Sequence, residues 1–144
     1  MPFDAYRAML DATTAAVTGL ATTGSSVYES PRSALDGSVF PALAVLAREI
    51  RASVFAVDPD TDDNLELHQF EIIVSTIALT RDQRDTSSLE VKTAILATAK
   101  PGYQRRYLGT SFEETAEGDR PLWVASQRFE IDYHVQATVP GVTV

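Results

Sequence analysis

The segment from Pro121 to Gln136 alternates apolar and polar side chains more clearly than any other part of the chain. Its apolar face comprises Trp123, Ala125, Phe129, Ile131, Tyr133 and Val135. Its polar face comprises Ser126, Arg128, Glu130, Asp132, His134 and Gln136. A period of two residues is the repeat of a β-strand that buries one face. The chain is therefore expected to contain a sheet with one face against a core.

Other segments also have the composition of strands. They lie at residues 27–28, 39–56, 65–80 and 103–115. The stretch from Ile72 to Leu79 is largely apolar on both faces, which predicts a central strand covered on both sides. The acidic turn at residues 58–64 and the turn at residues 116–120 are each short enough to join their flanking strands into a hairpin.

Two segments instead repeat their apolar residues every three to four positions, as amphipathic helices do. The first runs from Asp4, a candidate cap, towards a stop at Gly24, and its inner face comprises Tyr6, Met9, Leu10, Thr13, Val17 and Leu20. The second follows the cap candidates Thr86, Ser87 and Ser88, and its inner face comprises Leu89, Lys92, Ile95, Leu96 and Ala99. Pro101-Gly102 is expected to end the second helix.

These elements predict an α+β fold in the order α-β-β-β-α-β-β. Short connections favour a mostly antiparallel sheet of about five strands, with two helices packed on one face. At 144 residues the chain has the length of one ordinary domain. We expect a single domain over residues 1–136 and a flexible C-terminal tail over residues 137–144.

Composition narrows the classes of function. The chain has no cysteine, which rules out disulfides, thiolate chemistry and cysteine-based zinc sites. A net charge of −8 has the wrong sign for holding nucleic-acid phosphates. The sequence lacks both an apolar run long enough to span a bilayer and the basic start of a signal peptide, so a soluble protein made in a cytosol is expected.

The acidic turn resembles a calcium-binding loop only in part. Asp58, Asp60 and Asp62 have the alternate spacing of such a loop. Asp63 stands where the loop needs glycine, and Gln69 stands where it needs a bidentate glutamate. A solvated hairpin turn is therefore the preferred interpretation.

Two histidines are the remaining candidates for a metal site. If their strands pair, His68 and His134 could meet and bind a metal with Glu66, Glu130 or Asp132. Surface histidines without such a role are far commoner, so we predict no metal and no cofactor.

Catalytic patterns are equally weak. The sequence has no nucleophile elbow and no phosphate-binding glycine loop. Glu113, Glu114 and Glu117 lie beside a hairpin turn, where carboxylates are usually just solvated. We predict that the protein is not an enzyme, and a small metal-dependent enzyme is the less favoured alternative.

Charged residues suggest surfaces for assembly. The candidate subunit or tube interface comprises Arg81, Arg84, Arg105, Arg106 and Arg120. The candidate acidic loops that face a channel or an axial partner comprise Asp58, Asp60, Asp62, Asp63, Glu117 and Asp119. Basic residues in an acidic chain suit an acidic partner surface, and contact between unlike surfaces of one chain generates rings.

The C-terminal segment, residues 118–133, has the sequence GDRPLWVASQRFEIDY. This segment resembles the closing hairpin of the tail-terminator proteins of long-tailed bacteriophages, with an acidic-glycine turn, a strand that begins with proline and an F-E-x-x-Y ending. Upstream features agree with the resemblance: a first helix, a Thr-Gly turn before Val27-Tyr28, and the entry Phe40-Pro41-Ala42-Leu43 to the next strand.

The resemblance implies a structural virion protein in the neck region of the tail, assembled in the host cytoplasm. Its subunits would form a hexameric ring that caps the tail tube, stops tube polymerisation and presents a docking surface to the head connector. The implied partners are further copies of the chain, the tail tube protein and the head connector, and DNA would pass through the ring without specific binding. Another neck adaptor or tail completion protein is the alternative.

Overall fold

The computed structural model describes residues 5–29, 39–57, 64–97, 103–117, 120–136 and 139–143. The elements are α1 (Ala5–Val17), β1 (Val27–Tyr28), β2 (Ala42–Val57), β3 (Asn64–Ala78), α3 (Arg81–Ala97), β4 (Tyr103–Glu117), β5 (Arg120–Gln136) and β6 (Val139–Thr143). The predicted α+β fold and its order of elements are confirmed as far as β5.

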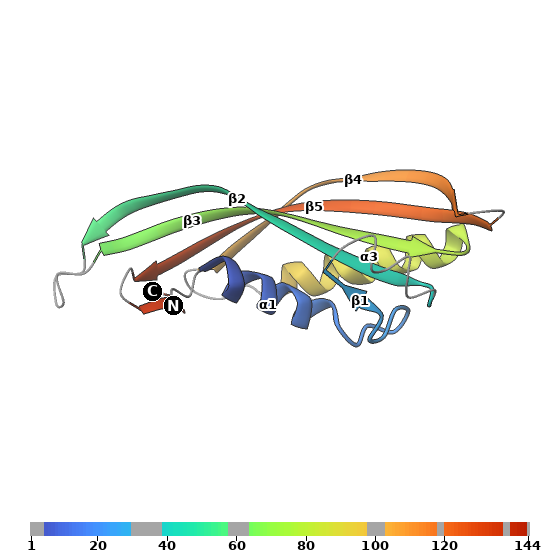
Figure 1. The fold of residues 1–144 in the computed structure, drawn as a ribbon, viewed down its shortest axis with the longest axis horizontal. Coiled ribbons are helices and arrows are strands. Elements are labelled where there is room, and N and C mark those ends of the chain that lie inside the picture. The colour runs from blue at the N-terminus through green and yellow to red at the C-terminus, as the bar shows by residue number, and fades with distance from the viewer. Residues whose placement is uncertain are drawn as a thin grey trace.

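One sheet contains all the strands, in the spatial order β1-β2-β3-β5-β4 (Figure 1). The short β1 runs parallel to β2, and the other strand pairs are antiparallel. The two predicted hairpins, β2–β3 and β4–β5, are both present. β3 occupies the middle of the sheet, as its apolar character on both faces predicts.

The C-terminal segment differs from the expected flexible tail. Residues Val139–Thr143 form β6, which pairs with the end of β5 through Val135–Thr143 and Gln136–Val139. Pro140 and Gly141 within this segment weaken the strand pattern in the sequence, and the preceding β5 supplies the backbone partners that the local sequence does not predict.

Both helices cover the same face of the sheet, as predicted (Figure 1). The main core lies between them and the three central strands. Its buried members are Met9, Leu10, Val17, Leu43, Val45, Phe70, Ile72, Val74, Val91, Ile95, Phe129 and Ile131. Neither helix is long and apolar enough to cross a membrane.

The inner face of α1 agrees with its predicted periodicity. Met9, Leu10, Thr13 and Val17 are buried, and the hydroxyl of Thr13 donates to the carbonyl of Met9 at 2.9 Å. The helix ends at Val17, earlier than the predicted stop. Gly19 follows with a φ of +85°, a conformation that favours glycine and commonly ends helices. Asp4 lies outside the described residues.

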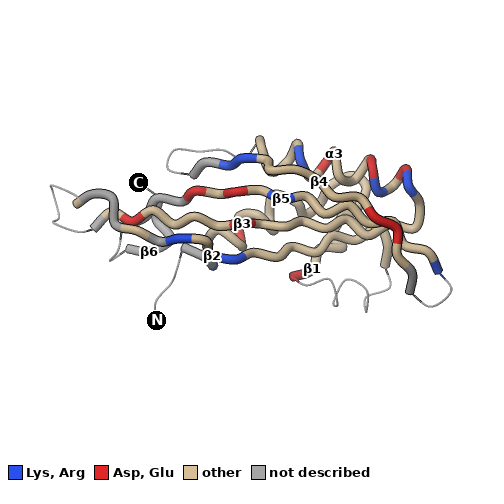
Figure 2. The backbone as a smooth tube through the Cα atoms, turned by 90° about the horizontal axis from the view of Figure 1, so that it is seen from above, with Lys and Arg blue, Asp and Glu red and all other residues tan. Residues whose placement is uncertain are grey.

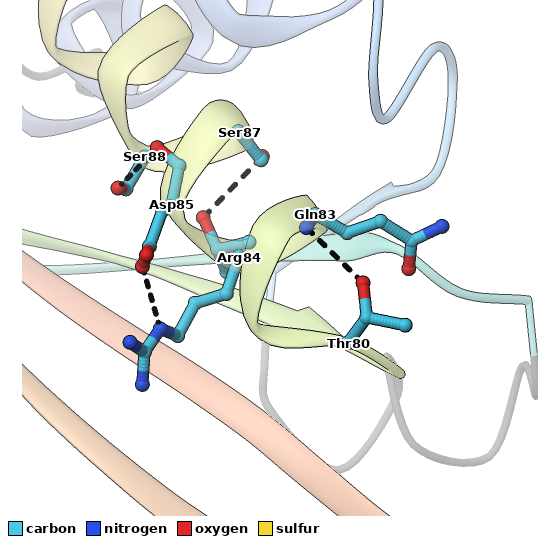
Figure 3. Close-up of polar contacts among 7 residues, drawn as sticks. Thr80, Gln83, Arg84, Asp85, Ser87 and Ser88 are labelled. Atoms are coloured by element: carbon cyan, nitrogen blue, oxygen red, sulfur yellow. Dashed lines mark hydrogen bonds and ion pairs between the residues drawn. The ribbon is translucent and has the colours of Figure 1, made fainter.

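The predicted start of α3 is wrong, and its buried face differs from the predicted one, although Ile95 is buried as expected. The helix begins at Arg81, where the backbone N–H of Gln83 donates to the hydroxyl of Thr80 at 3.2 Å (Figure 3). Its buried residues are Arg84, Ser87, Ser88, Val91 and Ile95, whereas Leu89 is 66% exposed. Polar partners on the sheet explain the difference: the amide of Gln127 donates to the carbonyl of Ser88 at 2.9 Å.

A second, smaller core lies on the face of the sheet opposite the helices. Its buried members are Ala42, Ala44, Ile77, Leu122 and Val124, and Tyr28 and Phe40 pack against them. We call this face the open face, because neither α1 nor α3 covers it (Figure 1).

The orientation of α3 predicts unequal effects of two similar substitutions. Ile95→Ala should lower the free energy of unfolding by about 2–5 kcal/mol, because it leaves a cavity in the main core. Leu89→Ala should change it by less than about 0.5 kcal/mol, because the side chain is exposed. Urea unfolding of both variants measures this, and equal losses would contradict the assigned face.

Candidate functional site

A row of charged residues crosses the open face on four neighbouring strands. The pairing register places Arg48 of β2 opposite Glu71 of β3, Glu71 opposite Glu130 of β5, and Glu130 opposite Arg106 of β4. We call these four residues, together with Arg128, the charged row. Successive residues of a strand face opposite sides of the sheet, and residues paired directly across strands face the same side. The side chains of these four residues therefore share one face.

Glu71 is the buried member of the charged row. Its carboxylate accepts a hydrogen bond from Arg128 at 2.7 Å and lies 3.4 Å from Arg48. The hydrogen bond from Arg128 is the main cause that lowers the pKa of Glu71; burial opposes it, and the positive charges of Arg128 and Arg48 add to it. Glu130 pairs with Arg106 at the other end of the row.

Apolar side chains border the charged row. Leu46 and Ile73 line a pocket of about 280 Å³ whose other walls include Arg48 and Glu71. Farther along the same face the hydroxyls of Ser75 and Ser126 lie 3.0 Å apart. The open face therefore combines neutralised charges with exposed apolar area, a composition that suits contact with protein.

Two of the predicted interface arginines stack on aromatic rings at the start of α3. The guanidinium carbon of Arg81 lies 5.0 Å from the ring centre of Trp123. That of Arg84 lies 4.8 Å from the ring centre of Phe112 and 5.4 Å from that of Trp123. Arg84 is buried and its Nε donates to Asp85 at 2.9 Å (Figure 3). Arg84 therefore acts as packing within the subunit.

The remaining predicted interface arginines lie elsewhere. Arg105 and Arg106 are neighbours on β4 and line a pocket of about 260 Å³ with Glu130 and Asp132. Arg120 starts β5 and its guanidinium carbon lies 4.9 Å from the ring centre of Phe40. The structure therefore distributes the five arginines over both ends of the β4–β5 hairpin, and they do not form one patch.

The predicted acidic loops are mostly outside the described residues. Residues 58–63, including the calcium-like spacing, and Asp119 belong to that part. Glu117 ends β4, where it pairs with Arg120. Glu113 pairs with Val124 and Glu114 with Trp123, so successive register positions place the two carboxylates on opposite faces. Such an arrangement does not converge them on one reacting atom.

The two histidines lie on the paired strands β3 and β5, and the side chain of His134 is outside the described part of the structure. His68 pairs with Tyr133, and His134 pairs with Leu67, so the register assigns them to opposite faces. The ring nitrogens of His68 contact Glu49 at 3.1 Å and Glu66 at 3.0 Å. Within the described ranges, no three histidine or acidic side chains are placed to hold a metal ion.

Sequence reasoning missed the residues that link the elements. Glu71 stands directly before the β-branched run Ile72-Ile73-Val74, and a carboxylate on a central strand is a signal of a cationic neighbour. Gln127 stands in the apolar alternation of β5 and is buried against α3. Glu90 accepts hydrogen bonds from the backbone N–H of Thr22 at 3.0 Å and from its hydroxyl at 2.6 Å. No local pattern predicts a contact over 68 residues.

Arg128→Ala tests the charged row. At pH 7 it should lower the free energy of unfolding by about 1–3 kcal/mol, because a buried carboxylate loses its main donor. Since the folded pKa of Glu71 lies below the ordinary value of 4.5, the stabilisation is present above that value and is lost as pH falls through the folded pKa. Urea unfolding at pH 7, 5 and 3 should show the deficit shrinking with acidity.

The matched control is Arg7→Ala, because Arg7 pairs with the exposed Asp11 and Glu29. It should cost about 1 kcal/mol or less. A deficit for Arg128→Ala that persists unchanged at pH 3 would contradict the assigned role of Glu71.

Arg84→Ala tests the aromatic packing. Trp123 is the sole tryptophan, so its fluorescence reports this environment. Loss of the buried stem and of two cation–π contacts should cost about 1–3 kcal/mol and shift the emission to longer wavelength. Arg81→Ala, at the exposed end, should cost less than half as much. Equal effects of the two variants would contradict the difference in burial.

Comparison with known protein families and with curated protein sequences yields no match. The resemblance to tail-terminator proteins therefore stays a prediction.

Proposed function

We propose that the chain is a structural virion subunit that assembles with copies of itself, and that it acts as a tail terminator: a ring that caps the tail tube, stops its polymerisation and offers a surface to the head connector. The proposal combines the sequence resemblance with the distribution of exposed apolar side chains. The latter is the structural observation that supports it.

Exposed apolar side chains occur along two opposite margins of the sheet. The β2 margin exposes Leu46, Ile50 and Val57, with Ile50 at 49%. The β4 margin exposes Leu108 and Phe112, with Phe112 at 56%. Contact between two unlike margins of successive copies is the head-to-tail geometry that closes into a ring when the rotation permits.

The helical side adds a groove between the turn after α1 and α3. Leu20 and Ala21 from the turn after α1 face Leu89, Glu90, Thr93 and Ala94 of α3 across a space of about 520 Å³. Exposed apolar area of this kind marks protein contact sites on soluble subunits. The net charge of −8 suits a channel through which DNA moves without being held.

The free protein provides the first test. Light scattering after size exclusion and negative-stain imaging should show a mass of six chains and ring-shaped particles, either alone or after addition of tail-tube subunits from the same phage. Polymerising tube subunits should stop at shorter lengths when the protein is present, with a ring at one end. Tubes of unchanged length without end rings would contradict the terminator function.

A variant of the β2 margin sharpens this experiment. Ile50→Asp should abolish ring formation and capping, because it introduces a charge into an apolar contact. Ala15→Asp, on the exposed side of α1, is the matched control and should assemble normally. Binding to the head connector without effect on tube length would instead identify another neck adaptor.

A further inference from the structure

The β4 strand lies at the edge of the sheet and exposes much of its length. Within the described part of the chain it pairs with β5 alone (Figure 2). Residues 111–115 are all exposed, and Arg106 has a side chain 66% exposed. An edge strand carries unpaired N–H and C=O groups, which another strand can use.

Charges follow a fixed order along this edge. Arg105 and Arg106 occupy the first half of β4, and Glu113 and Glu114 occupy the second half (Figure 2). An antiparallel copy of the same strand would run its acidic half beside this basic half. The edge is therefore a candidate for pairing with itself.

The register within the sheet tests that idea in detail. The β4 strand has one irregularity, between Tyr107 and Gly109, where Leu108 has no partner on β5. The position of every other β4 residue along the strand can be given by the β5 residue that it pairs with. Thr110 pairs with Gln127. If two β4 strands pair antiparallel with their Thr110 residues opposite each other, any two β4 residues whose β5 partners are equally far from Gln127, on either side, stand opposite each other.

This centre produces three matched pairs. They are Arg105 opposite Glu114, Arg106 opposite Glu113, and Tyr107 opposite Phe112. The β5 partners of each pair, residues 131 and 123, 130 and 124, and 129 and 125, are equidistant from residue 127. Each pair also falls on one face, because its two β5 partners are an even number of residues apart. Each matched pair occurs twice in a symmetric pair of strands, so the contact would contain four ion pairs and two aromatic pairs.

We propose that two copies of this chain pair along β4 in an antiparallel register centred on Thr110, which joins two sheets into one. α3 packs on β5, where the side-chain amide of Gln127 donates to the carbonyl of Ser88 on α3. It also reaches β4, where Arg84 lies over the ring of Phe112 and Lys92 over the ring of Tyr107. The edge itself stays accessible beside Phe112. Cross-strand ion pairs and aromatic pairs each stabilise a sheet.

Charge order also excludes competing arrangements. A parallel pair would place arginines beside arginines and glutamates beside glutamates, which is unfavourable. A shift by one residue would keep only one arginine opposite a glutamate, and the two would face opposite sides of the sheet. Bulges and charged side chains usually prevent an edge strand from pairing with another chain. Here the order of the charges along β4 favours one pairing register.

Pairing along β4 would also affect how the ring assembles, an inference that rests on the proposed function. A two-fold contact uses the same surface on both copies, whereas a ring uses unlike surfaces. Because the pair occupies the β4 margin, paired subunits would have to separate before they close into a ring.

Single cysteines test the pair, since the chain has no other cysteine. Opposed Thr110 positions would place their Cβ atoms about 4.5–5.5 Å apart, near disulfide range. Thr110→Cys should therefore form a crosslinked dimer rapidly under mild oxidation. In Thr115→Cys the two sulfurs would lie about 34 Å apart, ten residues at 3.4 Å each, and should crosslink at least ~10-fold more slowly. Similar rates for both variants would overturn the proposal.

Charge reversal provides a second test that does not depend on cysteine. Glu113→Arg with Glu114→Arg leaves only basic charges in the paired segment 105–114, and Arg105→Glu with Arg106→Glu leaves only acidic ones there. Each variant alone should dimerise on the order of 100-fold more weakly, and an equimolar mixture should recover the dimer. Analytical ultracentrifugation measures both, and circular dichroism verifies folding. If the unaltered protein is monomeric at 100 times the concentration used for the crosslinking, or if the mixture fails to dimerise while both variants are folded, the proposal is wrong. These readouts concern the free protein, so they are independent of tube capping.

Discussion

Pairing between β3 and β5 is the contact on which the rest of the structure depends. It joins the β2–β3 and β4–β5 hairpins into one sheet. The paired residues are far apart in the chain: Ser75 and Ser126, for example, are separated by 51 positions. Phe70, Ile72, Phe129 and Ile131 come together on the helix-covered face through this ladder. The same ladder brings Arg128 to the buried carboxylate of Glu71 on the open face. Without it neither the main core nor the charged row would exist.

The two faces of the sheet are covered unequally, because both helices lie on one of them (Figure 1). The helices bury one face, so apolar side chains outside that core gather at the sheet margins and on the outer side of α3. Among the described residues, Arg48, Arg84, Arg106 and Arg128 each pair with a carboxylate of the same chain. In the proposed ring, such a chain would present shape and apolar area to its neighbours, and its acidic excess would face solvent or the channel.

Sequence patterns predicted the elements well where burial follows the local period. The inner face of α1 and the central position of β3 are of this kind. The pattern failed for α3, because its inner face contains Arg84, Ser87 and Ser88, whose partners are an aromatic cluster and sheet polar groups. For the candidate site, the sequence led to the prediction that the arginines of β4 are interface residues, which stays a prediction. It did not reveal that Arg84 is buried or that Glu71 needs two arginines.

The order of charges along residues 105–114 is a property of the sequence alone, as are the strand periods and the hairpin turns. Local sequence determines these features because neighbouring residues share one backbone conformation. Only the tertiary structure decided that β4 stands at an edge, that β6 returns to β5 and that α3 turns its serines inward. Each depends on partners distant in the chain, whose contacts outweigh the small local preferences of the residues involved.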